Sequence, residues 1–126
     1  SATRRLYSIR HRFPFEAKRV HEKAQIFLGK HDFRLFSHEN KELNHHICEI
    51  FHIAFESIND DEFRFSIRAN RFLHNMVRIL LGTLLFSEKN NLDEKYLKKL
   101  LNEGPKNEIG PTLPPHGLFL AKIFYR

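Results

Sequence analysis

The residue types best suited to chemistry share one stripe of a helix predicted over 72–86. His74, Arg78 and Gly82 recur at intervals of four residues and therefore lie on one face, with Asn75 beside them. The rest of this helix is apolar, which predicts that it is buried. A buried guanidinium keeps its charge and must be paired, most often with a carboxylate. Pattern alone assigns such a pair more readily to structure, or to Arg78 reaching the surface, than to catalysis.

Tyr7 is a second candidate, on a strand predicted over 5–13. It shares one strand face with Ile9 and Phe13, because these residues alternate with a more polar set. An aromatic ring in this place can serve as a platform for a nucleobase. The alternative is an ordinary core aromatic with its hydroxyl at the rim, and the pattern by itself favours that alternative.

Arginines give two predicted strands a basic face. Arg64 and Arg68 alternate with apolar residues over 63–70, and Arg10 and Arg12 do so on the first strand. Lys plus Arg number 21 against 15 for Asp plus Glu, a net charge of +6, which favours an anionic partner such as nucleic acid. These faces are either solvated surface or a groove for phosphates.

Other kinds of site find little support. The nine histidines lack convincing ligand spacing, and Cys48 is a lone cysteine, so we expect no metal site and no intrachain disulfide. No glycine-rich phosphate loop and no recognisable partner for Cys48 as a nucleophile occur. Since no apolar run approaches the roughly 18 residues of a membrane span, and no signal peptide opens the chain, we expect a cytoplasmic protein without membrane contact.

The elements that must position these residues predict an α+β domain over 1–126, with a largely antiparallel sheet and helices packed on one face. The strands over 47–58 and 63–70 should pair as a hairpin through a turn at 59–61. The predicted elements are, in order, a strand over 5–13, a helix over 16–28 capped by Gly29, a turn at 31–33, a strand over 47–58 with a bulge, a strand over 63–70, a helix over 72–86, a helix begun by an Asn91/Glu94 capping box and ended at 104–105, a long ordered loop over 104–115 and a strand over 118–125.

Four segments resemble one known family. Ala69 to Leu85 closely resembles the FLxxMVRxxxGxLL signature of the TruA family of tRNA pseudouridine synthases. Ser1 to Tyr7 is similar to the family's SATxRxY segment, Leu28 to Phe36 to its LxGxHDFxxF segment, and Gly110 to Leu120 to its TAPAxGLxL segment. The four occur in family order across nearly the whole chain.

The resemblance covers the C-terminal half of such an enzyme. No counterpart of the family's RTDxGVHA-like motif, which carries the catalytic aspartate, occurs in the chain. We therefore expect one half of a pseudouridine synthase fold, cut within a longer protein and inactive by itself. Local departures are Ile9 in place of a tyrosine, Leu113 in place of an alanine, and missing glycines over 86–90.

The resemblance also implies the function. The family isomerises uridine to pseudouridine in the anticodon stem-loop of tRNA, without a cofactor, as a homodimer that binds tRNA across both subunits. Tyr7 would stack on the target uracil and take part in proton removal, and Arg78 would pair with the catalytic aspartate. The implied partners are tRNA and the missing N-terminal half. Candidate RNA contacts are Arg5, Arg64, Arg68, His74 and Asn75.

Two alternatives remain open from the sequence. The first is a free-standing RNA-binding module without catalysis, which would bind an anticodon stem-loop with a steep salt dependence. The second is a structural or dimerisation domain whose charge is incidental, which would have no RNA affinity even at low salt.

Overall fold

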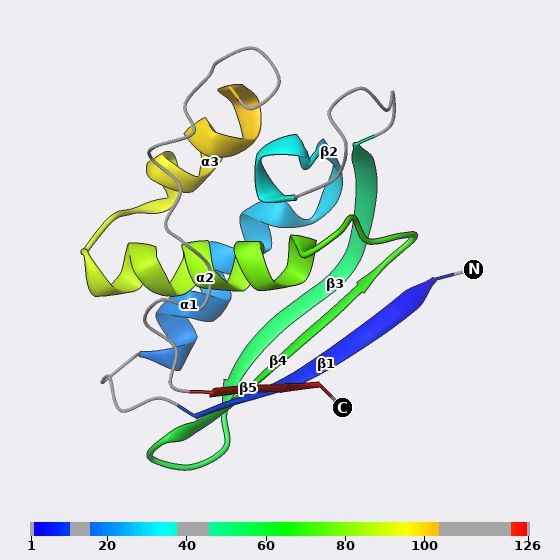
Figure 1. Cartoon of the computed structure of the whole chain (residues 1–126). Helices are drawn as coiled ribbons and strands as arrows, with labels where there is room; N and C mark the ends of the chain where they lie inside the picture. The colour runs from blue at the N-terminus through cyan, green and yellow to red at the C-terminus, as the bar shows by residue number, and fades with distance from the viewer. Residues whose placement is uncertain (1, 11–15, 38–45, 104–121, 126) are drawn as a thin grey trace.

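Five antiparallel strands form one sheet, and α-helices cover one of its faces (Figure 1). The computed structural model describes residues 2–10, 16–37, 46–103 and 122–125. The strands are ordered β2-β3-β4-β1-β5 across the sheet. The elements are β1 (Thr3–Arg10), α1 (Ala17–Ala24), the 3-10 turn η1 (Gln25–Phe27), β2 (Gly29–Asp32), the 3-10 turn η2 (Arg34–Phe36), β3 (Ile47–Ser57), β4 (Glu62–Ala69), α2 (Met76–Lys89), α3 (Glu94–Glu103) and β5 (Lys122–Tyr125).

This arrangement confirms the predicted α+β class, the antiparallel sheet and the helices on one face. The hairpin of β3 and β4 is also confirmed. Its pairing register shifts between Ile50 and His52, which places the bulge expected within this strand. One strand, β2, was missed, because Gly29 was interpreted as a helix cap and His31 and Asp32 as part of a turn. The predicted loop over 104–115, the end of the first predicted strand at 11–13 and the start of the last one at 118–121 lie outside the described residues.

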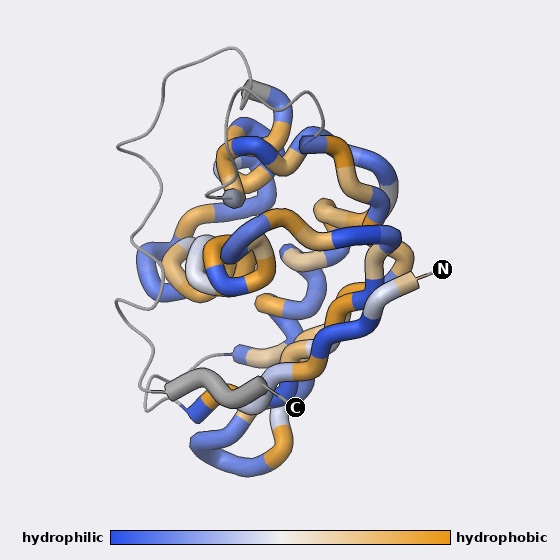
Figure 2. The backbone as a smooth tube through the Cα atoms, turned by 45° about the vertical axis from the view of Figure 1, so that its right-hand side comes forward, coloured by the Kyte–Doolittle hydropathy of each residue, from blue (hydrophilic) through white to orange (hydrophobic). Residues whose placement is uncertain are grey.

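Alternation along the strands separates a buried face from an open one. Figure 2 shows hydrophilic and hydrophobic residues alternating along the strands beneath the helices. The inward side chains of β4, from Phe63 to Ala69, are at most 3% exposed, and they meet the inward residues of β1 and β3 directly across the ladders. The opposite side of the sheet carries Arg64 and Arg68. No described helix covers that side (Figures 1 and 2).

The central helix α2 begins four residues later than predicted. Asn75 has a φ of 59° and a ψ of 11°, a left-handed conformation that a helix interior does not accommodate, so residues before Met76 form a turn. The backbone N–H of Met76 donates to the carbonyl of Leu73 in that turn. His74 therefore precedes the helix, and the predicted helical stripe of His74, Arg78 and Gly82 is wrong at its first member.

Of the two predicted helix caps, one is confirmed and the other is wrong. The α1–η1 helical segment ends at Phe27, and Leu28 is its extended C-cap residue. Gly29 comes next, with a φ of +95° in the region that favours glycine, so its position just after the helix end is confirmed. The Asn91/Glu94 capping box does not form. Asp93 caps α3 instead, because its carboxylate accepts the backbone N–H of Lys95 at 3.0 Å.

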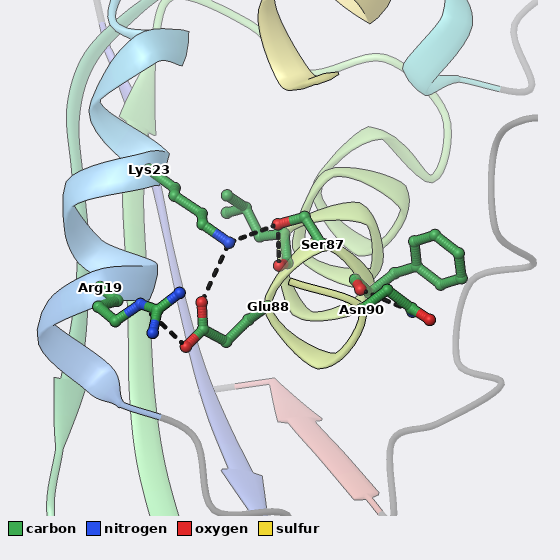
Figure 3. Close-up of polar contacts among 7 residues, drawn as sticks. Arg19, Lys23, Ser87, Glu88 and Asn90 are labelled. Carbon is green, nitrogen blue, oxygen red and sulfur yellow. Dashed lines mark hydrogen bonds and ion pairs between the residues drawn. The ribbon is translucent and has the colours of Figure 1, made fainter. Parts of the chain in front are cut away.

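A buried ion pair joins α1 to the end of α2 (Figure 3). The Lys23 ammonium lies 3.0 Å from one carboxylate oxygen of Glu88 and 3.3 Å from the Ser87 hydroxyl. The other Glu88 oxygen lies 3.4 Å from the guanidinium of Arg19. The side chains of Lys23 and Glu88 are each 8% exposed, so each charge depends on the other for compensation.

Replacing Glu88 by alanine should lower the free energy of unfolding by about 3 kcal/mol, because Lys23 would remain buried without a counter-charge. Urea denaturation measures the loss. Glu56→Ala, which removes an exposed carboxylate, is the matched control and should change stability by about 0.5 kcal/mol or less. A Lys23→Met/Glu88→Met double variant should recover most of the stability. Equal midpoints for Glu88→Ala and Glu56→Ala would show that the pair stabilises nothing.

Candidate functional site

The inward face of β1 meets the chain segment that leads into α2. The guanidinium carbon of Arg5 lies 4.8 Å from the centre of the Phe72 ring, which is cation–π distance. Tyr7 follows on the same strand face, opposite Phe65 in the ladder, and is 7% exposed. The alternation predicted for Tyr7 and Ile9 is confirmed, and both side chains belong to the core cluster.

The turn before α2 holds His74 and Asn75. His74 is exposed, and Asn75 is partly exposed and uses its carbonyl to accept the backbone N–H of Ile79 at 3.0 Å. This bond closes the first turn of α2 and fixes where the helix starts. Arg78 is therefore the third residue of α2, and the segment just before the helix contains Phe72, which Arg5 contacts.

Arg78 is exposed, so the expectation that it is buried is wrong. Its neighbours Val77 and Ile79 are 2% and 6% exposed and meet the core. Nearly every other position of α2 is also buried, and Gly82, one turn after Arg78, is among them. Within the described ranges, no ion pair joins Arg78 to a carboxylate. The guanidinium is thus held on a helix that packs into the core, and it is available to an acidic group from elsewhere.

The other predicted RNA contacts lie on the opposite side of the sheet. Arg68 is exposed, and Arg64 is partly exposed and faces Glu56 across the β3–β4 ladder. Because strand side chains alternate between faces, these arginines cannot share a surface with Arg5 and Tyr7. The structure therefore places Arg5 and Tyr7 on the sheet face that the helices cover, and α2 with its preceding turn carries His74, Asn75 and Arg78 on that same side (Figure 1). We call these five residues the inward group, and Arg64 and Arg68 the outward group.

One exposed aromatic residue was missed by the sequence reasoning. Phe51 lies at the β3 bulge, is 42% exposed, and has the Arg68 guanidinium 5.2 Å from its ring centre. The signal was available, since the segment over 47–58 carries apolar residues on both faces. That density predicts a strand but does not indicate which residue the bulge turns outward.

A separate cleft of about 440 Å³ opens between α1 and the start of α3. It contains none of the candidate residues named above, and its charged groups are of both signs. Its lining residues are Arg19, Glu22, Lys23, Asn91, Leu92, Asp93, Glu94, Lys95 and Lys98.

The described residues hold no cluster of three or more histidine, cysteine or acidic side chains that could bind a metal ion. Cys48 is buried in the core. Burial raises the pKa of the Tyr96 hydroxyl, which belongs to α3 and whose ring lies 6.5 Å from that of Phe86. None of the helices in the described part is long and apolar enough to cross a membrane.

Comparison with known proteins gives one consistent result. The sequence model of a family described as tRNA pseudouridine synthase matches residues 24–126. A protein of Leptospira biflexa named tRNA pseudouridine synthase A is 35% identical over 86% of this chain and 41% of its own length. Proteins of the same name from Bacillus pumilus and Myxococcus xanthus are 32% and 33% identical, over 96% and 90% of this chain and 49% and 43% of their own lengths. The chain thus spans less than half the length of each of these relatives.

Proposed function

The chain belongs to the tRNA pseudouridine synthase family, and from this premise we propose that it forms the tyrosine- and arginine-bearing part of a site that converts uridine to pseudouridine in tRNA. The observation that carries the proposal is the exposed Arg78 on α2, whose other residues from Met76 to Leu85 are all buried. A cation fixed in this way suits a carboxylate supplied by another part of the protein.

The reaction is an isomerisation, and its atoms balance within the nucleotide. The bond from the ribose C1′ to N1 of uracil breaks, a bond from C1′ to C5 forms, and the proton lost from C5 is matched by one gained at N1. No oxidant, reductant or cofactor is needed for that balance. The protein must bring the base out of its stack, hold it while it turns, and stabilise the charge that develops.

The inward group of residues fits these tasks. We assign Arg78 to the catalytic aspartate, where its charge would keep the pKa of the carboxyl low and the carboxylate ionised. We assign Tyr7 to contact with the uracil. Because Tyr7 is 7% exposed, that contact is limited to the small accessible part of its side chain. We assign Arg5, which contacts Phe72, and His74 and Asn75 in the turn that follows Phe72 to the flanking nucleotides.

We further propose that the substrate is a uridine in the anticodon stem-loop and that the complete protein acts as a homodimer. Incubating the complete protein with unmodified tRNA transcripts labelled with tritium at C5 of uracil tests the activity, since isomerisation releases the tritium to water. Mapping pseudouridine in the products tests the location. Absence of pseudouridine in every tRNA, with RNA binding retained, would favour the module without catalysis.

Substituting Tyr7 with leucine should lower turnover about 100-fold, through loss of the ring contact with uracil and of the hydroxyl. Tyr7→Phe keeps the ring and should bind tRNA as tightly as the natural protein, with slower turnover. Single-turnover rates and binding constants for tRNA separate these effects. Phe65→Leu, at the core position opposite Tyr7, controls for damage to packing. Equal turnover for Tyr7→Leu and Phe65→Leu would remove Tyr7 from the site.

A further inference from the structure

The open face of the sheet carries a row of basic residues, two arginines and a histidine. Arg4 lies directly opposite Arg68 in the β1–β4 ladder, and Arg68 lies directly opposite His52 in the β3–β4 ladder. All three residues are exposed. Like charges opposite one another in an antiparallel pair are destabilising, so the Arg4–Arg68 pair opposes folding unless an anion compensates it.

The acidic residues of β3 and β4 do not compensate this row. Each of them lies opposite a basic residue outside this row, and none lies opposite Arg4 or Arg68. Within the described residues, Arg4 and Arg68 form no ion pair. The opposed pairs are Glu49 with Lys30, Glu56 with Arg64 and Glu62 with Arg10.

An exposed aromatic ring lies beside the row. The bulge between Ile50 and His52 holds Phe51 outward, where 42% of it is exposed. The Arg68 guanidinium covers the ring at 5.2 Å, and the His52 imidazole lies 3.5 Å from the Ser66 hydroxyl. An aromatic ring next to unpaired cations is the combination with which proteins bind unpaired nucleotides, through stacking and phosphate contacts.

We propose that Arg4, Arg68, His52 and Phe51 form a second RNA-binding surface, the open-face site, on the side of the sheet opposite Tyr7. The two arginines bind the sugar–phosphate backbone, with His52 beside them, and Phe51 stacks on an unpaired base. The choice of tRNA as the RNA that binds here rests on the proposed function. The open-face site is additional to it, because no residue of this site lies on the inward face that carries Tyr7.

One RNA can reach both faces across an edge of the sheet. In the described part, β5 pairs with β1 only from Tyr7 to Arg10, so the first half of β1 has a ladder partner on one side alone. Arg4 and Arg5 are neighbours in that half, and alternation directs one to each face. An RNA strand that passes around this edge from the inward face would contact Arg5 first and Arg4 next. The two faces can therefore hold successive parts of the same tRNA.

Binding of an unmodified tRNA transcript to the complete protein, measured over a range of salt concentrations, tests the open-face site. Arg4→Ala/Arg68→Ala should weaken binding at least about tenfold and reduce the slope of log Kd against log salt by about two. Phe51→Leu should weaken binding about tenfold with little change in slope. Arg10→Ala/Lys30→Ala removes the same charge from the same face, at positions opposite glutamates, and should change affinity less than threefold.

Two results would overturn the proposal. One is an unchanged slope and affinity in Arg4→Ala/Arg68→Ala. The other is a change from dimer to monomer in sedimentation, which would assign this face to contact between copies of the chain. Folding should not obscure the outcome, since removing opposed like charges is expected to stabilise the ladder. Turnover at saturating tRNA should stay normal in the variant, whereas failure of the proposed function would appear as absent turnover in the natural protein.

Discussion

The 126-residue chain, incubated with tRNA, is expected to form no pseudouridine, and the same chain joined to an N-terminal half with an RTD-type motif is expected to form it. The reason is chemical. The inward group offers a phenol, two guanidinium groups, an imidazole and an amide, but among the described residues no carboxylate forms an ion pair with Arg78. Without the aspartate that attacks or stabilises the sugar, the rate should fall by several orders of magnitude.

Controls make this experiment specific. Binding of tRNA by the chain alone should be measured in the same samples, so that a chain without RNA affinity is recognised. The joined protein should lose its activity again when the aspartate of the RTD-type motif is changed to asparagine. Pseudouridine formed by the 126 residues alone would refute the assignment of the aspartate to another part of the protein.

Much of the fold could be predicted because local pattern and global structure agree. Phe63, Phe65 and Ile67 alternate with polar residues, which identified β4 and its hairpin correctly. The resemblance to the TruA family is confirmed by the family match and by the curated relatives. The start of α2 could not be predicted, because it depends on the left-handed backbone of Asn75, which the apolar periodicity of the following residues does not indicate.

The candidate site was harder to predict, because it depends on which face each residue takes. Arg78 was expected to be buried since its neighbours are apolar, but a helix covered on most sides can still expose one position. Arg5 and Arg68 were grouped as RNA contacts, and only the strand register separates them onto opposite faces. The same register aligns Arg4 with Arg68, a relation between residues 64 positions apart that composition cannot express.

Arg78→Ala in the complete protein should reduce turnover about 100- to 1,000-fold, while tRNA binding changes little. The catalytic aspartate would lose the cation that favours its ionised form, so its pKa should rise. Activity that depends on the carboxylate would then fall at neutral pH, and the acidic limb of the pH–rate profile should move to higher pH. Arg78→Lys should recover part of the rate, since an ammonium keeps the charge but lacks the guanidinium's paired donors.

Because Arg78 is exposed, its substitution separates an effect on catalysis from an effect on stability. Truncating an exposed side chain usually changes stability by about 0.5 kcal/mol or less, so a large loss of turnover would not come from unfolding. Lys89→Ala, at the exposed end of the same helix, is the matched control and should leave turnover unchanged. A shifted pH profile in Arg78→Ala, absent from Lys89→Ala, would identify the carboxylate as the partner of Arg78. Near-normal turnover in a folded Arg78→Ala protein would instead assign Arg78 a place on the surface without a role in the reaction.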